Sequence, residues 1–312
     1  GLPLTVFRLR DEDEIAVLEM GISDFGEMTR LAKIARPKVS VITNIGWCHL
    51  ENLKTRDGIF RAKTEMFDWL QKDGTVIVNG DDDKLCQIQE VHGKKPVFFG
   101  LNSAFPVWAD QIEPMGLKGT RCQIHADGQL CTVQIPLPGS HMVYNALAGT
   151  AVGLTFGMTL DQICNGIEKL KPLSGRFNIL DLAGRVVVDD CYNANPVSMK
   201  ASLQILEEGQ GRRIAILGDM GELGENEASL HEEVGAFAGT LKIDVLYTVG
   251  TLTKGLEQKA KEANPSLVTR HFATLDELLE NLSGLTAPGD TILVKASHFM
   301  HFEKIVEVFK SM

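Results

Sequence analysis

The chain has 312 residues, enough for two domains, and its 41 acidic against 31 basic residues give a formal net charge of −10. Because it contains no Lys/Arg-rich run, nucleic acid and anionic membrane surfaces are poor partner candidates. Its apolar runs are far shorter than the roughly 20 residues of a membrane span, and its start lacks a signal-peptide pattern, so we expect a soluble, intracellular protein.

The first part of the chain predicts alternating strands and helices. GLPLTVFRL enters an apolar run with no cap, turn or initiator Met before it, so we expect a fragment. The alternation is typical of a mostly parallel sheet with helices on both faces. Strands are predicted at residues 14–21, 37–46 and 74–83, and helices at residues 26–35 and 56–71.

Residues 116–136 interrupt this alternation. RCQIHADGQLCTVQI contains two runs of alternating apolar and polar residues around ADGQ, which predicts a β-hairpin. We expect this hairpin to be an antiparallel addition at one edge of the sheet. Helices at residues 136–153 and 159–170 follow, and the Pro, Ser and Gly residues of the stretch 171–178 indicate a linker.

A second α/β domain, of doubly wound type, is predicted after the linker. We therefore place the boundary between a first domain, residues 1–176, and a second domain, residues 177–312. The expected strands are 185–190, 212–218, 244–250 and 291–297, and the expected helices are 198–208, 229–239, 252–263, 275–282 and 301–309.

Polar residues directly follow many of the apolar runs. In open α/β sheets, ligands bind beyond the carboxyl ends of the strands. Because these polar residues come from both predicted domains, the sequence predicts a two-domain enzyme with a cleft between the domains. They are Glu19, Asn44 with His49, residues 79–83, 189–195 and 218–222, and Lys295 with Ser297.

Three residues of the first domain are candidates for chemistry. Glu19 closes an apolar run, where a carboxylate can hold Mg²⁺, although a cap or a turn is the more common role. His49 follows another strand, and an isolated His is more often structural. Lys63 lies mid-helix in apolar company, which fits either a snorkelling side chain or a neutral, reactive amine.

His141 and Asn145 lie one helical turn apart at a helix start, so they share a face. A helix N-terminus favours anions, and an Asn amide can read a base edge. Arg176 is the arginine of the linker, and a guanidinium group suits phosphate. Plain solvent exposure is the alternative reading of Arg176.

The stretch VVVDDCYNANPVSM carries a more specific pattern. Asp189 and Asp190 point to opposite faces of the strand end, so that one can face a ligand hydroxyl while the other caps the loop. Asn193 and Asn195 can fix the loop by local hydrogen bonds. A second acidic loop, LGDMGELGENEASLH, follows the next strand. A simple turn does not require several acidic residues, and here two successive loops contain them. The acids of the second loop are Asp219, Glu222 and Glu225.

The six cysteines contain no CxxC pair, which argues against a zinc site and against a disulfide framework. We expect most of them to be buried thiols, because free Cys packs as a small hydrophobic residue. Cys191, beside the acidic pair, is the one candidate for a special role.

Eight segments together resemble the Mur ligase family over nearly the whole chain: EMGISDFGE, VITNIGWCHLENL, RAKTEMFDWL, VNGDDD, GSHMVYNALA, LSGRFN, DDCYNANPVSMKASL and LGDMGELG. The resemblance implies a central ATP-binding ligase domain with an ATPase-type sheet, followed by a Rossmann-like C-terminal ligase domain. The P-loop and the N-terminal domain of the family are absent from these residues. We therefore expect this chain alone to have no ligase activity.

The resemblance also implies the ligands of the first domain. Glu19 and His49 would hold a Mg²⁺ ion. Lys63 would be carbamylated by CO₂ and would support a second Mg²⁺ ion, which gives a reason for a lysine in apolar company. His141 and Asn145 would lie against ATP, with Asn145 at the adenine.

For the linker and the second domain, the resemblance implies that Arg176 contacts an ATP phosphate, that Asp190 contacts the ribose hydroxyls and that Asp189 caps the loop. Ala296 and His298 depart from the VKGSR-like sequence that is common in the family, so the role of their loop stays open. The residues assigned to the pocket for the peptide end and the acceptor are Asn193, Asn195, Asp219 and Glu222.

DDCYNANP together with LGDMGELG is most similar to the family members that add D-alanyl-D-alanine to UDP-N-acetylmuramoyl-tripeptide. Such ligases use ATP to phosphorylate the substrate carboxylate, and the incoming amine attacks the acyl phosphate. The resemblance implies an enzyme of peptidoglycan synthesis in the bacterial cytoplasm, and we expect a monomer. A sister ligase adding another amino acid, and a non-catalytic binding relative, are the two alternatives.

Overall fold

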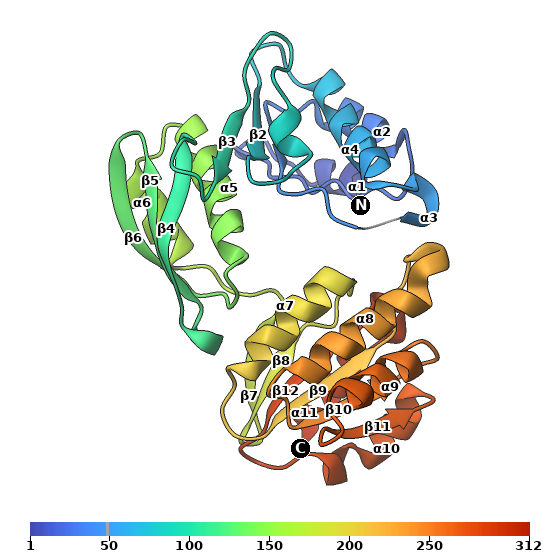
Figure 1. Ribbon diagram of the computed structural model, residues 1–312. Coiled ribbons are helices and arrows are strands. Elements are labelled where there is room, and N and C mark those ends of the chain that lie inside the picture. Colours follow the sequence, from blue (N-terminus) through green and yellow to red (C-terminus); the bar gives the residue numbers. More distant parts are fainter. Residues whose placement is uncertain (48–49) are drawn as a thin grey trace. The chain divides into compact units, whose positions relative to one another are not determined.

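The computed structural model describes residues 1–47 and 50–312, which form two compact units (Figure 1). His49 therefore lies outside the described residues. The chain leaves the first unit for the last time after Glu168, shortly before the predicted linker. The first unit contains Gly1–Glu113, Arg121–Ile135 and Ser140–Glu168, and the second contains Pro114–Thr120, Pro136–Gly139 and Lys169–Met312.

A six-stranded sheet forms the framework of the first unit, in the order β1-β2-β3-β4-β5-β6. Strands β1 to β4 are parallel. Asp127 and Gly128, both at positive φ, connect β5 to β6 as the expected hairpin at the sheet edge. The strands are β1 Val39–Ile42, β2 Thr75–Asn79, β3 Val97–Gly100, β4 Val107–Pro114, β5 Thr120–Ala126 and β6 Gln129–Ile135.

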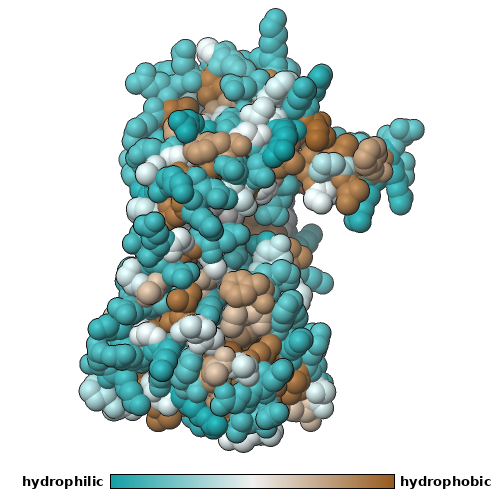
Figure 2. All heavy atoms as spheres, turned by 90° about the vertical axis from the view of Figure 1, so that its right-hand side faces the viewer, coloured by the Kyte–Doolittle hydropathy of each residue, from teal (hydrophilic) through white to brown (hydrophobic). Residues whose placement is uncertain are grey.

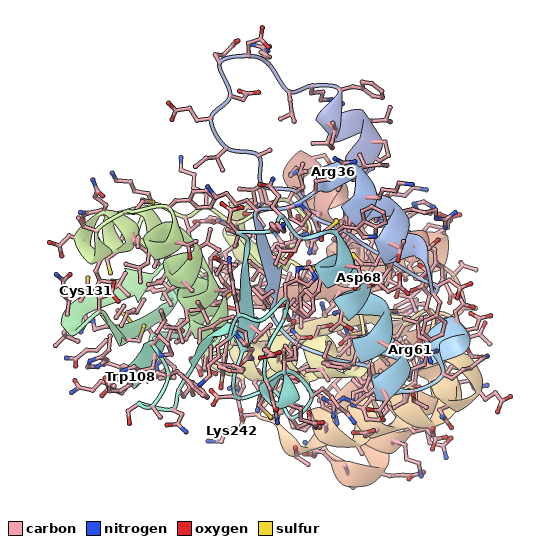
Figure 3. The ribbon with its side chains drawn as sticks, turned by 90° about the horizontal axis from the view of Figure 1, so that it is seen from above. Arg36, Arg61, Asp68, Trp108, Cys131 and Lys242 are labelled. Atoms are coloured by element: carbon pink, nitrogen blue, oxygen red, sulfur yellow. The ribbon has the colours of Figure 1, made fainter. Side chains whose placement is uncertain are left out.

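Local capping explains where helices of this unit begin. The Thr55 hydroxyl accepts the amide of Gly58 at the start of α4, and Thr159 forms a capping box at the start of α6. The guanidinium carbon of Arg61, a residue of α4 that Figure 3 labels, lies 4.4 Å from the ring centroid of Phe25. The helices are α1 Leu2–Val6, α2 Glu27–Ala35, α3 Leu50–Leu53, α4 Arg56–Thr64, α5 Met142–Thr155 and α6 Leu160–Ile167, with the 3-10 turns Glu65–Trp69 and Leu85–Gln87.

The strand predicted at residues 14–21 is wrong, because this segment is irregular in the structure. Ile15 is 57% exposed and Val17 is 90% exposed. Figure 2 shows apolar side chains at the surface of a projecting segment. A strand is stable only where a neighbouring edge satisfies its backbone hydrogen bonds, and in the described part of the chain no strand pairs with residues 14–21.

The second unit is the expected doubly wound domain. Its sheet has the order β11-β10-β9-β12-β8-β7, and all its pairs are parallel except β7 with β8. The strands are β7 Asn178–Leu182, β8 Arg185–Asp189, β9 Arg213–Gly218, β10 Val245–Val249, β11 Val268–Phe272 and β12 Thr291–Lys295. The helices are α7 Pro196–Glu207, α8 Glu227–Thr240, α9 Thr253–Ala263, α10 Leu275–Leu285 and α11 Glu303–Ser311, with the 3-10 turns Gly116–Lys118, Gly224–Asn226 and His298–Met300.

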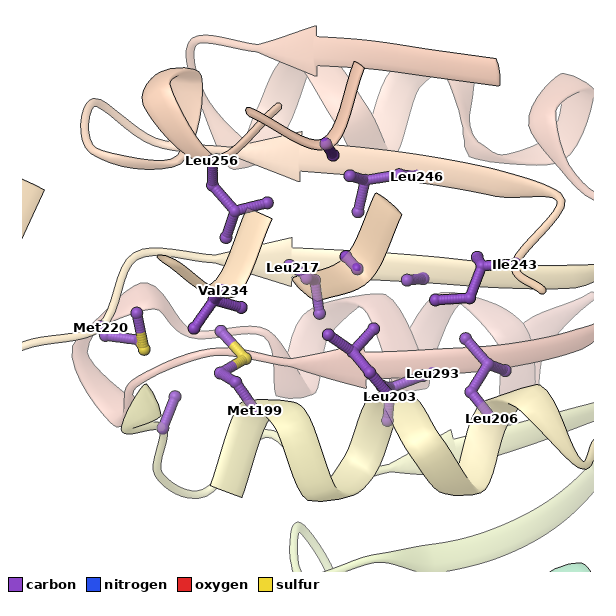
Figure 4. Packing of buried hydrophobic residues seen from close by; sticks show 14 of the residues in the cluster. Met199, Leu203, Leu206, Leu217, Met220, Val234, Ile243, Leu246, Leu256 and Leu293 are labelled. Carbon is purple, nitrogen blue, oxygen red and sulfur yellow. The ribbon is translucent and has the colours of Figure 1, made fainter. Parts of the chain in front are cut away.

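Two apolar clusters cover the two faces of this second sheet. Met199 of α7 and Val234 of α8 pack with Leu217 of β9 on one face (Figure 4). Ile216 of β9 packs with Phe309 of α11 on the other face. Because successive residues of β9 enter different cores, the sheet is buried on both faces, and polar groups gather at the strand ends. Within the described residues, no helix is long and apolar enough to cross a membrane.

Candidate functional site

Lys63 lies at the carboxyl end of β1. Its half-buried side chain extends from the last turn of α4, and its Nζ donates a hydrogen bond to the backbone carbonyl of Asn44 at 3.1 Å. Asn44 follows β1 by two residues. The structure therefore brings the helix candidate Lys63 to the strand-end candidate Asn44.

Glu19 lies in the irregular segment before α2, where its side chain is exposed. His49, the other expected metal ligand, falls outside the described ranges. Among the residues that the structure describes, no group of three or more His, Cys, Asp or Glu side chains could hold a metal ion. The donor chemistry still fits Mg²⁺, because a carboxylate and a lysine carbamate both offer oxygen ligands. The metal site stays a prediction.

The loop after β1 is fixed by the acidic run that follows β2. Asp82 accepts a hydrogen bond from the amide of Ile45 at 2.8 Å. Arg56 donates from Nε to the carbonyl of Ile45 at 2.9 Å and pairs with the carboxylate of Asp83. This hydrogen bond raises the pKa of Arg56 and lowers the pKa of Asp83. The sequence pattern located the acids but gave no signal for Arg56.

His141 and Asn145 are exposed at the start of α5, as their spacing predicted. The amide Nδ2 of Asn145 lies 3.3 Å from Sδ of Met142. A thioether is a weak acceptor, so a ligand can replace this contact at little cost. The arrangement leaves the Asn145 amide available to a base edge, and the adenine contact stays a prediction.

Asp189 is buried and already hydrogen-bonded to the linker. Its Oδ2 accepts the amide of Gly175 at 2.8 Å and the hydroxyl of Ser174 at 3.4 Å, and its Oδ1 accepts the thiol of Cys191 at 3.0 Å. Burial, followed by the hydrogen bond to Asp189, raises the pKa of the Cys191 thiol. Cys191 is therefore a protonated, buried thiol.

Asp190 has a different set of partners. Its Oδ1 accepts the amide of Phe177 at 3.1 Å, and its Oδ2 accepts the hydroxyl of Ser202 and the ammonium of Lys295, both at 2.7 Å. Lys295 is 2% exposed and also donates to the carbonyl of Asn193 at 3.0 Å. A carboxylate has about four acceptor sites, so Asp190 retains capacity for a ribose hydroxyl, which stays a prediction.

Arg176 is exposed, and its guanidinium carbon lies 4.1 Å from the ring centroid of Tyr192. The Tyr192 ring in turn lies 5.5 Å from the ring of His298. These three side chains form a cationic and aromatic surface beyond the ends of β8 and β12. The linker pattern predicts Arg176 and the departure from the family sequence marks His298, whereas no sequence pattern indicates Tyr192, the residue that lies between them.

The two amides of the NAN motif stabilise their own loop. The Oδ1 of Asn193 accepts the amide of Ala194 at 2.8 Å. Asn195 is the N-cap of α7, and it forms a capping box with Ser198. These are the local hydrogen bonds that Asn residues were expected to make. Their contribution to a substrate pocket stays a prediction.

Asp219 supports the start of α9 from the end of β9. Its carboxylate lies close to Gly250, which has φ 118°. A Cβ at position 250 would lie 2.5 Å from the Asp219 carboxylate, so a glycine permits this close approach. Glu222, at φ 60°, lies exposed in the loop that follows. The substrate roles of Asp219 and Glu222 stay predictions. The backbone amides that donate to Asp219 belong to Thr251, Leu252 and Thr253.

Comparison with known proteins matches both units. The model of the Mur ligase middle domain matches residues 1–153, and the model of the Mur ligase, glutamate ligase domain matches residues 175–298. The "UDP-N-acetylmuramoyl-tripeptide--D-alanyl-D-alanine ligase" of Bacillus subtilis is 36% identical, with 98% of this chain and 66% of the relative covered. The enzyme of the same name from Escherichia coli is 34% identical, with 99% and 68% covered. The chain thus spans about two thirds of these relatives.

Solved structures give the same result. A crystal structure of MurF from Acinetobacter baumannii superposes with a TM-score of 0.89 at 32% identity, covering 100% of this chain and 68% of that one. MurF ligase from Thermotoga maritima, in complex with ADP, gives a TM-score of 0.85 at 29% identity, covering 100% and 70%. Folylpolyglutamate synthase of Mycobacterium tuberculosis, at 17% identity and a TM-score of 0.67, shares the fold.

Proposed function

The chain belongs to the Mur ligase family, and on this premise we propose that it is the ATP-using part of a ligase that joins D-alanyl-D-alanine to UDP-N-acetylmuramoyl-tripeptide. The observation that carries the proposal is the match, at 34% and 36% identity over at least 98% of this chain, to ligases that bear these substrates in their names. Because the chain spans about two thirds of those relatives, the activity is proposed for the complete protein.

The proposed reaction has two steps. A carboxylate oxygen of the tripeptide attacks the γ-phosphorus of ATP, ADP leaves, and an acyl phosphate forms. The amine of D-alanyl-D-alanine then attacks the acyl carbon, phosphate leaves, and the nitrogen loses a proton to give the amide. Arg176 supports this chemistry, because an exposed guanidinium can donate two hydrogen bonds to a phosphate whose charge changes during the transfer. The remaining acceptor capacity of Asp190 suits a ribose hydroxyl, and Asn145 suits the adenine.

Glu19, His49 and a carbamate on Lys63 are proposed to hold two Mg²⁺ ions, which would supply positive charge to the transferring phosphoryl group. Lys63 must lose its proton before its nitrogen can add to CO₂, and the addition converts a cation into an anionic oxygen ligand. Its contact to the carbonyl of Asn44 places this nitrogen at the end of β1, where ligands bind in open α/β sheets.

Exposed groups beyond β8 and β9 are proposed to shape the pocket for the two peptide substrates. Asn193 and Glu222 are exposed there, whereas Asn195 and Asp219 contribute by fixing the loops. We place the reaction in the bacterial cytoplasm and assign it to a monomer, as expected from the resemblance.

Release of phosphate from ATP by the complete protein tests this function. We expect release to require both UDP-N-acetylmuramoyl-tripeptide and D-alanyl-D-alanine, with each omission as a control. Single amino acids and a folate with glutamate serve as alternative substrate pairs. Phosphate release with one of these pairs instead would assign the protein to a sister ligase. No phosphate release from the folded protein with any pair would contradict a ligase.

A further inference from the structure

The linker is held by two adjacent carboxylates, one on each side of Arg176. Asp189 accepts the amide of Gly175 at 2.8 Å, and Asp190 accepts the amide of Phe177 at 3.1 Å. The residue before Arg176 and the residue after it are therefore tied to the end of β8. The backbone of Arg176 is fixed while its side chain is exposed.

Tyr192 restrains the exposed side chain. Its amide donates to the carbonyl of Gly175 at 2.9 Å, which fixes the position of the ring beside the linker. Gly175 has φ 75°, and a Cβ there would lie 3.2 Å from the Cβ of Tyr192, so a glycine permits this close approach. The guanidinium carbon of Arg176 lies over this ring, 4.1 Å from the ring centroid.

Asp190 is itself held in place from two further elements. Ser202 of α7 and Lys295 of β12 both donate to its Oδ2 at 2.7 Å. Lys295 is 2% exposed, so its charge needs the carboxylate as a partner. The side chain of Asp190 is thus held in one orientation by hydrogen bonds from α7 and β12 of the second unit.

We propose that Tyr192, Asp189 and Asp190 are positioning residues for Arg176, which hold its guanidinium in the orientation that binds an ATP phosphate. An arginine side chain that no neighbour restrains loses rotamer freedom when it binds a ligand, and this loss weakens binding. A guanidinium already held over an aromatic ring has less of this freedom to lose, and its N–H groups can still donate to phosphate oxygens. This inference rests on the proposed function, in which Arg176 contacts ATP.

A double-mutant cycle in the complete protein tests the proposal. The variants are Arg176→Ala, Tyr192→Leu and the two combined, and the readouts are KM for ATP and kcat. We expect Tyr192→Leu to raise KM for ATP about two- to fivefold, the size of an exposed cation–π contact, with a smaller change in kcat. In the Arg176→Ala background, the same substitution should have no further effect. Tyr192→Phe, which keeps the ring, should recover the KM that Tyr192→Leu loses.

The matched control is Phe156→Leu, which shortens an aromatic side chain of the first unit that is 42% exposed. Thermal unfolding checks that each variant is folded. Additive effects of the two substitutions, or a KM for ATP that Tyr192→Leu leaves unchanged although Arg176→Ala raises it, would overturn the positioning role alone. A KM that Arg176→Ala leaves unchanged would remove Arg176 from the proposed ATP site and would overturn this inference with it.

Discussion

Single polar residues at the strand ends differ in how much of their hydrogen-bonding capacity the protein itself uses. Asp189 is buried and accepts hydrogen bonds from Ser174, Gly175 and Cys191, whereas Lys63 donates to a backbone carbonyl and Arg176 lies over an aromatic ring. A carboxylate whose oxygens already accept hydrogen bonds from the protein has less acceptor capacity for a ligand. Lys63 and Arg176 are therefore the residues whose loss should affect turnover most.

Lys63→Ala is expected to lower kcat about a hundredfold, the size expected when one group that stabilises transferring charge is removed. The unfolding temperature should change little, because the lysine is half-buried and its hydrogen bond within the described residues goes to a backbone carbonyl. Phosphate release and thermal unfolding measure the two quantities. Lys72→Ala, at an exposed lysine that follows the 3-10 turn after α4, is the control. Equal kcat values for the two variants would remove Lys63 from the site.

Local sequence patterns predict residues of the candidate site. They do not predict the contact partners that lie far away along the chain. Arg176 and Asp190 follow from a linker cation and from acids after an apolar run. The pairing of Asp190 with Lys295 spans 105 residues, and the stacking of Tyr192 on Arg176 requires the linker to return to β8. Such contacts arise from sheet topology, which a single sequence leaves undetermined.

At the level of elements, predictions succeeded where a strand is buried on both faces. The central strands β8, β9, β10 and β12 have continuous apolar runs, which the sequence pattern identified. The edge strands β7 and β11 were missed, because exposed polar residues interrupt their pattern. Residues 14–21 show the reverse error: an apolar run predicted a strand, and no pairing partner lies beside it in the described part of the chain.

Asp219 connects two secondary-structure elements, because it lies at the end of β9 and accepts hydrogen bonds from the start of α9. Asp219→Ala leaves three backbone amides without their acceptor, so we expect the free energy of unfolding to fall by about 2–3 kcal/mol. Denaturant unfolding measures the loss. Asp219→Asn keeps one acceptor oxygen and should lose less, and Glu280→Ala, at an exposed acid of α10, is the control. An Asp219→Ala variant as stable as the control would favour the substrate role over the structural one.

At the scale of the whole chain, the net charge of −10 opposes the binding of anions such as the proposed substrates, ATP and a UDP-linked peptide. In the proposed function, affinity for these anions therefore comes from local groups, such as the linker arginine and the proposed Mg²⁺ ions, rather than from the net charge of the chain. The family models match residues in both units, and the proposed chemistry uses residues of both.

Stability is expected to decrease at alkaline pH. Burial raises the pKa of Cys122 from 9.0 to about 11, and it also raises the pKa of Cys164 and Cys191. Between about pH 9 and pH 11 the folded state keeps these protons while the unfolded state releases them, so stability present below that range is lost as the pH rises. Thermal unfolding against pH measures the decrease, and Cys164→Ala should reduce its slope. A midpoint that stays constant up to pH 11 would contradict the burial of these thiols.

The most direct test of a ligase that works through an acyl phosphate is isotope transfer. The complete protein is given ATP, D-alanyl-D-alanine and UDP-N-acetylmuramoyl-tripeptide whose terminal carboxylate carries heavy oxygen, and mass spectrometry follows the phosphate and the peptide. We predict that each phosphate released carries one heavy oxygen from the tripeptide and that the pentapeptide product forms in equal amount. Unlabelled phosphate would contradict the acyl phosphate, and phosphate released without the pentapeptide would contradict the ligase itself.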